Sequence, residues 1–232
     1  MKLLCLDTSS QVASCALVEN GRLVTEINLR HGLTHSAKLL PLMQAALDLA
    51  GWEFSDLTAL AVVAGPGSFT GLRIGAATVK GLAFSLNLPV IPVGTLEALA
   101  QNACGYTGLI VPLLDARRGE VYAAAYRMQG DRLQEVMAPC AQALTDFLAR
   151  MPEESAYAFV GDGVEPNRET LLAVQGAFLM PDSLRLQRAG AVADLAHQKY
   201  LAGETVSASD FLPDYLRESS AVPPQGLRLW DF

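Results

Sequence analysis

The stretch Ala64-Gly65-Pro66-Gly67-Ser68-Phe69-Thr70-Gly71-Leu72-Arg73-Ile74-Gly75 follows the apolar run Leu60–Val63 and opens an Ala-, Leu- and Gly-containing segment at 71–86. The apolar run predicts a buried strand, and the segment at 71–86 predicts a helix. Glycines on both sides of a proline allow a sharp turn, and Ser68 or Thr70 can cap the first free amides of the helix. The stretch is therefore a strand-to-helix turn. A capped turn is favoured over a phosphate cradle, and both interpretations stay open.

Composition limits the classes of protein to consider. The 232 residues suffice for one large domain or for two lobes of about 100 residues each. Hydrophobic residues make up 51% and mean hydropathy is +0.26, so we expect a large core or a surface that a partner covers. No apolar run reaches the ~20 residues of a membrane helix, and Asp7 comes too early for a signal peptide, which predicts a cytoplasmic protein. The net charge of −7 argues against free nucleic acid binding over the whole surface.

The first part of the chain predicts three strands followed by alternating helices and strands. An Asn20-Gly21 pair favours a hairpin between the second and third strands. The predicted strands lie at 2–6, 12–18, 23–29, 60–63 and 89–93, and the predicted helices at 36–50, 71–86 and 95–104. Pro41 lies within the second turn of the first helix, which predicts a kink or a later helix start.

The second part repeats this order. An apolar strand ends at Asp115 as the first strand ends at Asp7, and a polar turn and a second strand follow in both places. Further predicted elements are strands at 109–114, 120–126 and 156–160, helices at 141–150, 167–175 and 189–202, and an extended tail. We therefore predict an α/β fold of two lobes built from one duplicated unit, an N-terminal lobe at 1–105 and a C-terminal lobe at 106–232.

Two lobes that each open with a strand, an aspartate and a second strand resemble the actin-like ATPase superfamily, whose duplicated lobes have ribonuclease H-like topology. The chain also carries five more specific motifs: Asp7-Thr8-Ser9-Ser10, His35-Ser36 with Leu39-Leu40-Pro41, the stretch at 65–75, Asp115-Ala116-Arg117 with Gly119-Glu120-Val121-Tyr122, and Pro213 with Tyr215-Leu216-Arg217. In these motifs the sequence resembles the TsaB (YeaZ) family within that superfamily. These motifs span nearly the whole chain.

The resemblance implies a scaffold and activator for a tRNA-modifying enzyme, with no catalytic residue of its own. Such a protein would bind TsaD as a heterodimer and act with TsaE, downstream of TsaC, in placing threonylcarbamoyl on N6 of adenosine 37. It would form a homodimer when alone and reach tRNA only through the complex. It would hold no cofactor tightly, although ATP or ADP could bind at the interface of the complex.

A metal site is not expected. The metal motif of TsaD, Asn-His-x-Glu-Gly-His after a Pro-Val strand, corresponds here to Pro92–Leu99, where Thr95 and Leu99 replace the two histidines. These two side chains cannot both ligate a metal. His31 and His35 are four residues apart at a strand-to-helix junction without a third ligand, so a structural role is favoured for His35. A metallopeptidase-like protein therefore stays only as a weaker alternative.

The main alternative is an autonomous actin-like ATPase or kinase. Actin-like kinases approach Mg²⁺ and phosphate with aspartates at the places of Asp7 and Asp115. The residues that we expect near a nucleotide are Asp7, Thr8, Ser9, Asp115 and Arg117. Kinases usually have glycine where Ser9 stands, because backbone amides there meet phosphate, so autonomous hydrolysis is not favoured.

A partner surface is predicted on the helices at 36–50 and 71–86, because both carry more apolar and small residues than one buried stripe requires. Two core helices between sheet layers would explain the same pattern, and this alternative stays open. The residues predicted to bind the partner are Leu39, Leu40, Met43, Leu47, Leu72, Gly75, Ala76 and Val79.

Overall fold

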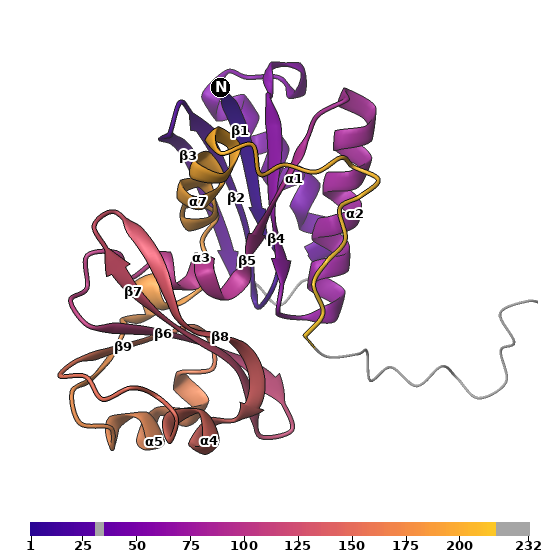
Figure 1. The fold of residues 1–232 in the computed structure, drawn as a ribbon. Helices are drawn as coiled ribbons and strands as arrows, with labels where there is room; N and C mark the ends of the chain where they lie inside the picture. The colour runs from indigo at the N-terminus through magenta and orange to yellow at the C-terminus, as the bar shows by residue number, and fades with distance from the viewer. Residues whose placement is uncertain (31–34, 217–232) are drawn as a thin grey trace, which may run out of the picture.

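Two lobes, each built on a five-stranded sheet, lie one above the other in the computed structural model, which describes residues 1–30 and 35–216 (Figure 1). The strand order is β3-β2-β1-β4-β5 in the first sheet and, from the matching edge, β8-β7-β6-β9-β10 in the second. In each sheet the three strands that come first in the chain pair antiparallel with one another. The last two, β4 and β5 or β9 and β10, run parallel to β1 or β6. The equivalent order confirms the predicted α/β fold with two lobes of duplicated topology.

The first sheet separates two apolar cores. Its strands are β1 (Lys2–Asp7), β2 (Val12–Glu19), β3 (Arg22–Arg30), β4 (Ala59–Gly65) and β5 (Val90–Gly94). On one face lie α1 (His35–Ala50) and α2 (Phe69–Leu86), and on the other α3 (Thr95–Gln101) and α7 (Ala189–Leu201). A 3₁₀ turn, η1 (Phe54–Asp56), leads into β4.

Local sequence signals account for the turns of this lobe. Asn20 and Gly21 have φ of 50° and 79°, as a tight two-residue hairpin turn requires. Ser68 caps α2 by accepting a hydrogen bond from the Gly71 amide at 3.3 Å. α1 begins at His35, one residue before the predicted start at 36, so of the two effects predicted for Pro41 the later start does not occur, and the kink stays a prediction.

The second lobe is less regular. Its strands are β6 (Leu109–Arg117), β7 (Glu120–Gln129), β8 (Arg132–Ala143), β9 (Tyr157–Val160) and β10 (Ala177–Leu179). Its helices are α4 (Leu144–Leu148), η2 (Glu165–Asn167), α5 (Arg168–Leu172) and α6 (Asp182–Arg185). The helix predicted at 141–150 begins only at Leu144, because β8 stays paired with β7 as far as Ala143.

α3 connects the lobes physically. Leu96, Leu99 and Ala100 pack against residues of β6, β7 and β9 in the second lobe. On its other side, Ala98 belongs to the core between the first sheet and α7. The lobes therefore share apolar packing and are not joined by a linker alone.

The chain returns to the first lobe after α6. α7 packs against β1, β2, β3 and β5, and its N-terminus is held by Ser14 and Glu26. The Ser14 Oγ accepts a hydrogen bond from the Ala189 amide at 2.6 Å, and Arg188 forms an ion pair with Glu26 at 2.6 Å. The predicted division at residue 105 differs from this packing, because residues 189–216 lie on the first lobe.

Residues 205–216 form an extended segment that we call the C-terminal strap. Val206 and Val90 exchange backbone hydrogen bonds at 2.8 and 2.9 Å, so the strap covers the open edge of β5. From there it runs along α2 toward the space between the lobes (Figure 1). The rest of the predicted extended tail, 217–232, lies outside the described residues.

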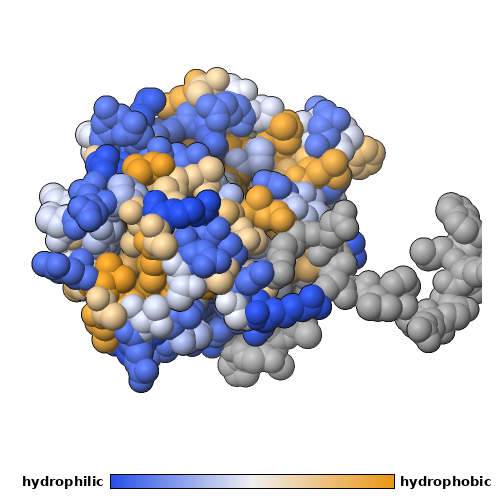
Figure 2. All heavy atoms as spheres, turned by 60° about the horizontal axis from the view of Figure 1, so that its bottom comes forward, coloured by the Kyte–Doolittle hydropathy of each residue, from blue (hydrophilic) through white to orange (hydrophobic). Residues whose placement is uncertain are grey.

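The surface of the second lobe is mixed in character. Figure 2 shows hydrophilic and hydrophobic residues interspersed over the face that is lowest in Figure 1. Within residues 1–30 and 35–216, we find no helix that is both long and apolar enough to cross a membrane.

Candidate functional site

A cleft of about 460 Å³ lies between the lobes. Its walls come from the turn after β1, the first turn of α2, the end of β6, the turn after β9 and the C-terminal strap. The polar side chains that line it include Ser9, Ser10, Asp115, Arg117 and Asp162.

Asp7 lies beneath the cleft and is 1% exposed. Its Oδ1 accepts hydrogen bonds from the amide of Ser9 at 2.8 Å and from the Ser9 hydroxyl at 2.6 Å. Burial raises the pKa of Asp7 to about 6, although the hydrogen bonds from Ser9 oppose the rise. The carboxyl therefore holds the turn that follows it through its Oδ1.

Asp115 makes the matching turn in the second lobe. Its Oδ1 accepts a hydrogen bond from the Arg117 amide at 2.8 Å, two residues on, as Asp7 does from Ser9. The Arg117 guanidinium forms an ion pair with the same carboxylate at 3.1 Å. Arg117 and Arg118 have φ of 65° and 56°, a conformation that costs about 1 to 3 kcal/mol for residues other than glycine. The turn thus holds two arginines at the mouth of the cleft.

Asp162 joins the two lobes across the cleft. Its Oδ2 accepts a hydrogen bond from the Ser10 hydroxyl of the first lobe, and its Oδ1 accepts one from the Asp115 amide at 3.1 Å. Burial raises the pKa of Asp162, opposed by these two hydrogen bonds. Sequence reasoning treated Gly161-Asp162-Gly163 as a turn. The flanking glycines were the available signal, because a side chain at either would meet the backbone of β6.

The turn that opens α2 is filled by protein atoms. Added Cβ atoms would lie 2.6 Å from the Ser9 carbonyl oxygen at Gly67 and closer than 3.0 Å to the Thr8 carbonyl oxygen at Gly71. The Ser68 amide donates to the Ser9 carbonyl at 2.7 Å, and the Gly71 amide donates to the Ser68 hydroxyl. Two amides that a phosphate cradle would use therefore have partners within the chain, which supports the capped turn.

The residues predicted to lie near a nucleotide do gather at one place. Ser9, Asp115 and Arg117 line the cleft. Asp7 and Thr8 lie behind it, and the Thr8 hydroxyl donates to the Gly71 carbonyl at 2.8 Å. Whether a nucleotide binds there stays a prediction.

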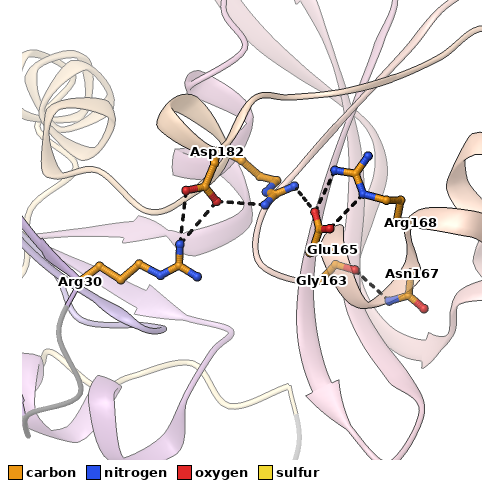
Figure 3. A network of polar contacts seen from close by, with 7 residues as sticks. Arg30, Gly163, Glu165, Asn167, Arg168 and Asp182 are labelled. Atoms are coloured by element: carbon orange, nitrogen blue, oxygen red, sulfur yellow. Dashed lines mark hydrogen bonds and ion pairs between the residues drawn. The ribbon is translucent and has the colours of Figure 1, made fainter.

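A network of ion pairs crosses between the lobes beside the cleft (Figure 3). Arg30 of β3 lies 3.4 Å from Asp182, which also binds Arg185 at 3.0 Å. Arg185 is 7% exposed and reaches Glu165 at 2.7 Å, and Arg168 reaches the same carboxylate at 2.9 Å. The hydrogen bonds from Arg168 and Arg185 lower the pKa of Glu165 to about 2. The lobes are therefore tied at the cleft's side as well as through α3.

The residues predicted to bind a partner mostly face inward. Seven of them are buried in the core of the first lobe: Leu39, Met43, Leu47, Leu72, Gly75, Ala76 and Val79. Leu40, by contrast, is 55% exposed. A direct contact by the seven is therefore blocked in the single chain, and the alternative of core helices explains those positions. The set of residues that a partner contacts stays a prediction.

The outward faces of α1 and α2 are nevertheless apolar. Their exposed apolar and small residues are Ala37, Leu40, Pro41, Ala45 and Leu49 on α1, and Ala77, Gly81 and Phe84 on α2. Leu49 and Phe84 are 77% and 85% exposed. Of the exposed positions in these two fully described helices, only Asp48 and Arg73 are charged. Large apolar side chains exposed together on neighbouring helices are a feature of protein interfaces.

The two positions at which the TsaD metal motif has histidines are occupied here by core residues. Thr95 and Leu99 are 0% and 1% exposed. His35 Nε2 lies 2.7 Å from the Ser10 carbonyl oxygen, a contact that ties the start of α1 to the turn after β1. His31 lies outside the described residues. Over the part of the chain that the structure describes, no three His, Cys, Asp or Glu side chains gather as a metal site requires.

Comparison with known proteins identifies relatives along nearly the whole chain. A family model described as TsaD, tRNA N6-adenosine threonylcarbamoyltransferase, matches residues 30–222. The TsaB protein of Bacillus subtilis is 31% identical over 224 residues, which cover 95% of this chain and 96% of that protein. TsaB of Escherichia coli is 32% identical over 229 residues, with 95% and 96% covered.

Comparison with solved structures leads to the same family. YeaZ from Pseudomonas aeruginosa superposes with a TM-score of 0.81 at 32% identity and covers 92% of this chain and 99% of that chain. The ADPNP-bound activator of 2-hydroxyisocaproyl-CoA dehydratase from Clostridium difficile has a TM-score of 0.51 at 12% identity, covers 88% and 97%, and shares the fold alone. The chain thus belongs to the TsaB (YeaZ) family of tRNA threonylcarbamoyladenosine biosynthesis proteins and has their two-lobed, actin-like ATPase fold.

Proposed function

We propose that the chain is a non-catalytic subunit that binds TsaD and activates it for threonylcarbamoyl transfer to adenosine 37 of tRNA. The observation that carries this proposal is the apolar outward face of α1 and α2, with Phe84 at 85% and Leu49 at 77% exposed. Burying such residues contributes about 1.5 to 3 kcal/mol each, so a partner of matching shape would be bound stably. TsaE would join this complex and TsaC would act before it.

The same face would form a homodimer when TsaD is absent, because the apolar face of α1 and α2 could then pack against the same face of a second copy of the chain. tRNA would be reached through the complex, since the chain carries a net charge of −7. No cofactor is bound tightly by the chain alone under this proposal, and ATP or ADP would bind only once the complex has formed. The protein would act in the cytoplasm, where tRNA is modified.

An autonomous ATPase or kinase is the alternative that the cleft suggests. Three features support the scaffold over it. Asp7 is 1% exposed and its Oδ1 is bonded to Ser9, Ser9 stands where a kinase needs glycine, and the Ser68 amide is already bonded to the Ser9 carbonyl. Turnover of Mg-ATP by the isolated chain would support the ATPase and contradict the proposal.

The test uses exposed positions, because changes at Gly75 or Ala76 would disturb the core. A Cβ at Gly75 would lie 2.5 Å from the Thr8 hydroxyl. We expect Phe84→Glu to fold, to lose TsaD binding at least a hundredfold, to be monomeric by light scattering, and to abolish modification in a system with TsaD, TsaE and TsaC. Leu201→Glu, at a 70% exposed position on the opposite face of the sheet, is the matched control. Unchanged TsaD affinity in a folded Phe84→Glu protein would refute the proposal.

A further inference from the structure

The C-terminal strap carries exposed apolar side chains beside the α1/α2 face. Leu212 is 74% exposed, and Tyr215 and Leu216 are 38% and 37% exposed. A single exposed leucine is common on protein surfaces and needs no explanation. A group of exposed apolar residues on a solvated connecting segment is unusual and indicates a surface that binds a partner. Here three apolar residues fall within five positions on a segment that runs along α2 (Figure 1).

The strap is held firmly enough to present these residues in one arrangement. Phe211 is 2% exposed in the core beneath α2. Lys80 of α2 donates hydrogen bonds to the carbonyls of Phe211 at 2.9 Å and Ser209 at 3.3 Å. The Asp214 amide donates to the Ala64 carbonyl at 2.7 Å. A surface that is already ordered loses little conformational entropy when it binds.

Strap and helix are also joined at the start of α2. The rings of Tyr215 and Phe69 lie 5.0 Å apart, and the Arg73 guanidinium lies 3.9 Å from the centre of the Phe69 ring. Tyr, Phe and Arg are enriched at the centres of protein interfaces, and Tyr and Arg at their energetic hot spots. This stack joins the strap to the first turn of α2, where Phe69, Tyr215 and Leu216 also line the cleft between the lobes.

We infer that the strap is part of the surface that binds TsaD: Leu212, Tyr215 and Leu216 contact apolar side chains of the protein that docks on α1 and α2. This inference rests on the proposed function and extends it beyond the two helices. Aromatic rings beside arginine also suit stacking of RNA bases. The two exposed leucines and the acidic charge of the chain favour a protein partner over RNA.

Leu212→Ser and Leu201→Ser form a matched pair, because the two leucines are 74% and 70% exposed and lie on different parts of the first lobe. Affinity for purified TsaD would be measured by calorimetry for both variants, for Tyr215→Ala and for Phe84→Ser. We expect Leu212→Ser and Tyr215→Ala to weaken binding at least fivefold, and Leu201→Ser to change it less than twofold.

The outcomes separate the two proposals. If Phe84→Ser weakens binding while Leu212→Ser and Tyr215→Ala match the Leu201→Ser control, the strap inference is wrong and the proposed function stands. If the unchanged protein does not bind TsaD, both proposals fail. If the strap variants bind TsaD normally but reduce retention of tRNA by the assembled complex, the strap binds RNA and the inference is overturned.

Discussion

Replacing Asp7 with asparagine should stabilise the protein at neutral pH, because burial opposes the charge on this carboxylate. Its pKa of about 6 lies above the ordinary 3.8. A carboxyl whose pKa is raised by folding costs stability above that pKa, and the cost disappears as the pH falls toward 3.8. For these values the cost is about 3 kcal/mol at pH 7.5 and about 1.6 kcal/mol at pH 5. Asparagine removes the charge and keeps an oxygen for the donors of Ser9.

Urea unfolding of the unchanged protein and of Asp7→Asn at both pH values measures this effect. Comparing the two proteins at each pH cancels carboxyls that titrate in the opposite sense, such as Glu165. We expect the variant to be more stable by about 1 to 3 kcal/mol at pH 7.5, with a smaller gain at pH 5. Asp115→Asn, at the matching turn but 39% exposed, should change stability by less than about 1 kcal/mol.

Two results would refute this reasoning. A variant that is less stable at pH 7.5 would show that the Ser9 hydrogen bonds to the charged form outweigh burial. A gain that grows as the pH falls would show that the pKa is lowered, not raised. tRNA modification by the assembled complex should survive the substitution, and a loss on the order of a thousandfold with the complex intact would make Asp7 a catalytic group.

Two further predictions concern stability. Gly71→Ala should lower the free energy of unfolding by more than about 3 kcal/mol, because its Cβ would overlap the Thr8 carbonyl oxygen. The Cβ of Gly81→Ala would meet no atom, so this substitution should stabilise α2 by about 0.5 to 1 kcal/mol. Thermal unfolding of both variants checks this, and equal effects would contradict the packing argument. Arg185→Met should cost about 1 to 3 kcal/mol by leaving two carboxylates without their buried cation, and Arg30→Ala less than about 1 kcal/mol. Only the Arg30→Ala effect should vanish in 0.5 M salt, and a salt-sensitive Arg185→Met effect would count against burial as its cause.

The duplicated fold was predictable because its signals are local. Short continuous apolar runs mark the buried strands, and Asn20-Gly21 marks the first hairpin. The aspartates at 7 and 115 mark equivalent strand ends. The end of β8 was less predictable, since Ala138–Ala143 holds no feature that separates a paired strand from the start of a helix; pairing with β7 decides it.

The orientation of α1 and α2 could not be read from the sequence. Almost every position of both helices is apolar or small, so the periodic pattern that distinguishes a core face from an outer face is weak. Sequence reasoning therefore chose residues such as Met43 and Val79, which the structure buries completely. Phe84, the most exposed large apolar residue on these helices, was not among them.

The return of α7 to the first lobe depends on contacts between distant residues. Glu26 of β3 accepts hydrogen bonds from Arg188 at 2.6 Å and from the Gly190 amide at 3.0 Å. These bonds satisfy free amides at the start of the helix, and nothing in the sequence near α7 reveals their partner. A boundary drawn from local turn signals at residue 105 could not include this packing.

One difference between the lobes concerns the turn after the first strand and the helix that lies on it. In the first lobe, glycines at 67 and 71 let α2 lie directly on the turn that Asp7 holds, and the carboxyl is buried. In the second lobe the corresponding position is taken by α5, which has five residues and leaves Asp115 partly exposed. A helix of eighteen residues offers a long outward face, whereas five residues offer little more than one turn. The close approach that glycines 67 and 71 allow thus places the start of α2 on the turn of Asp7, and the long outward face of α2 is the one that we propose for the partner.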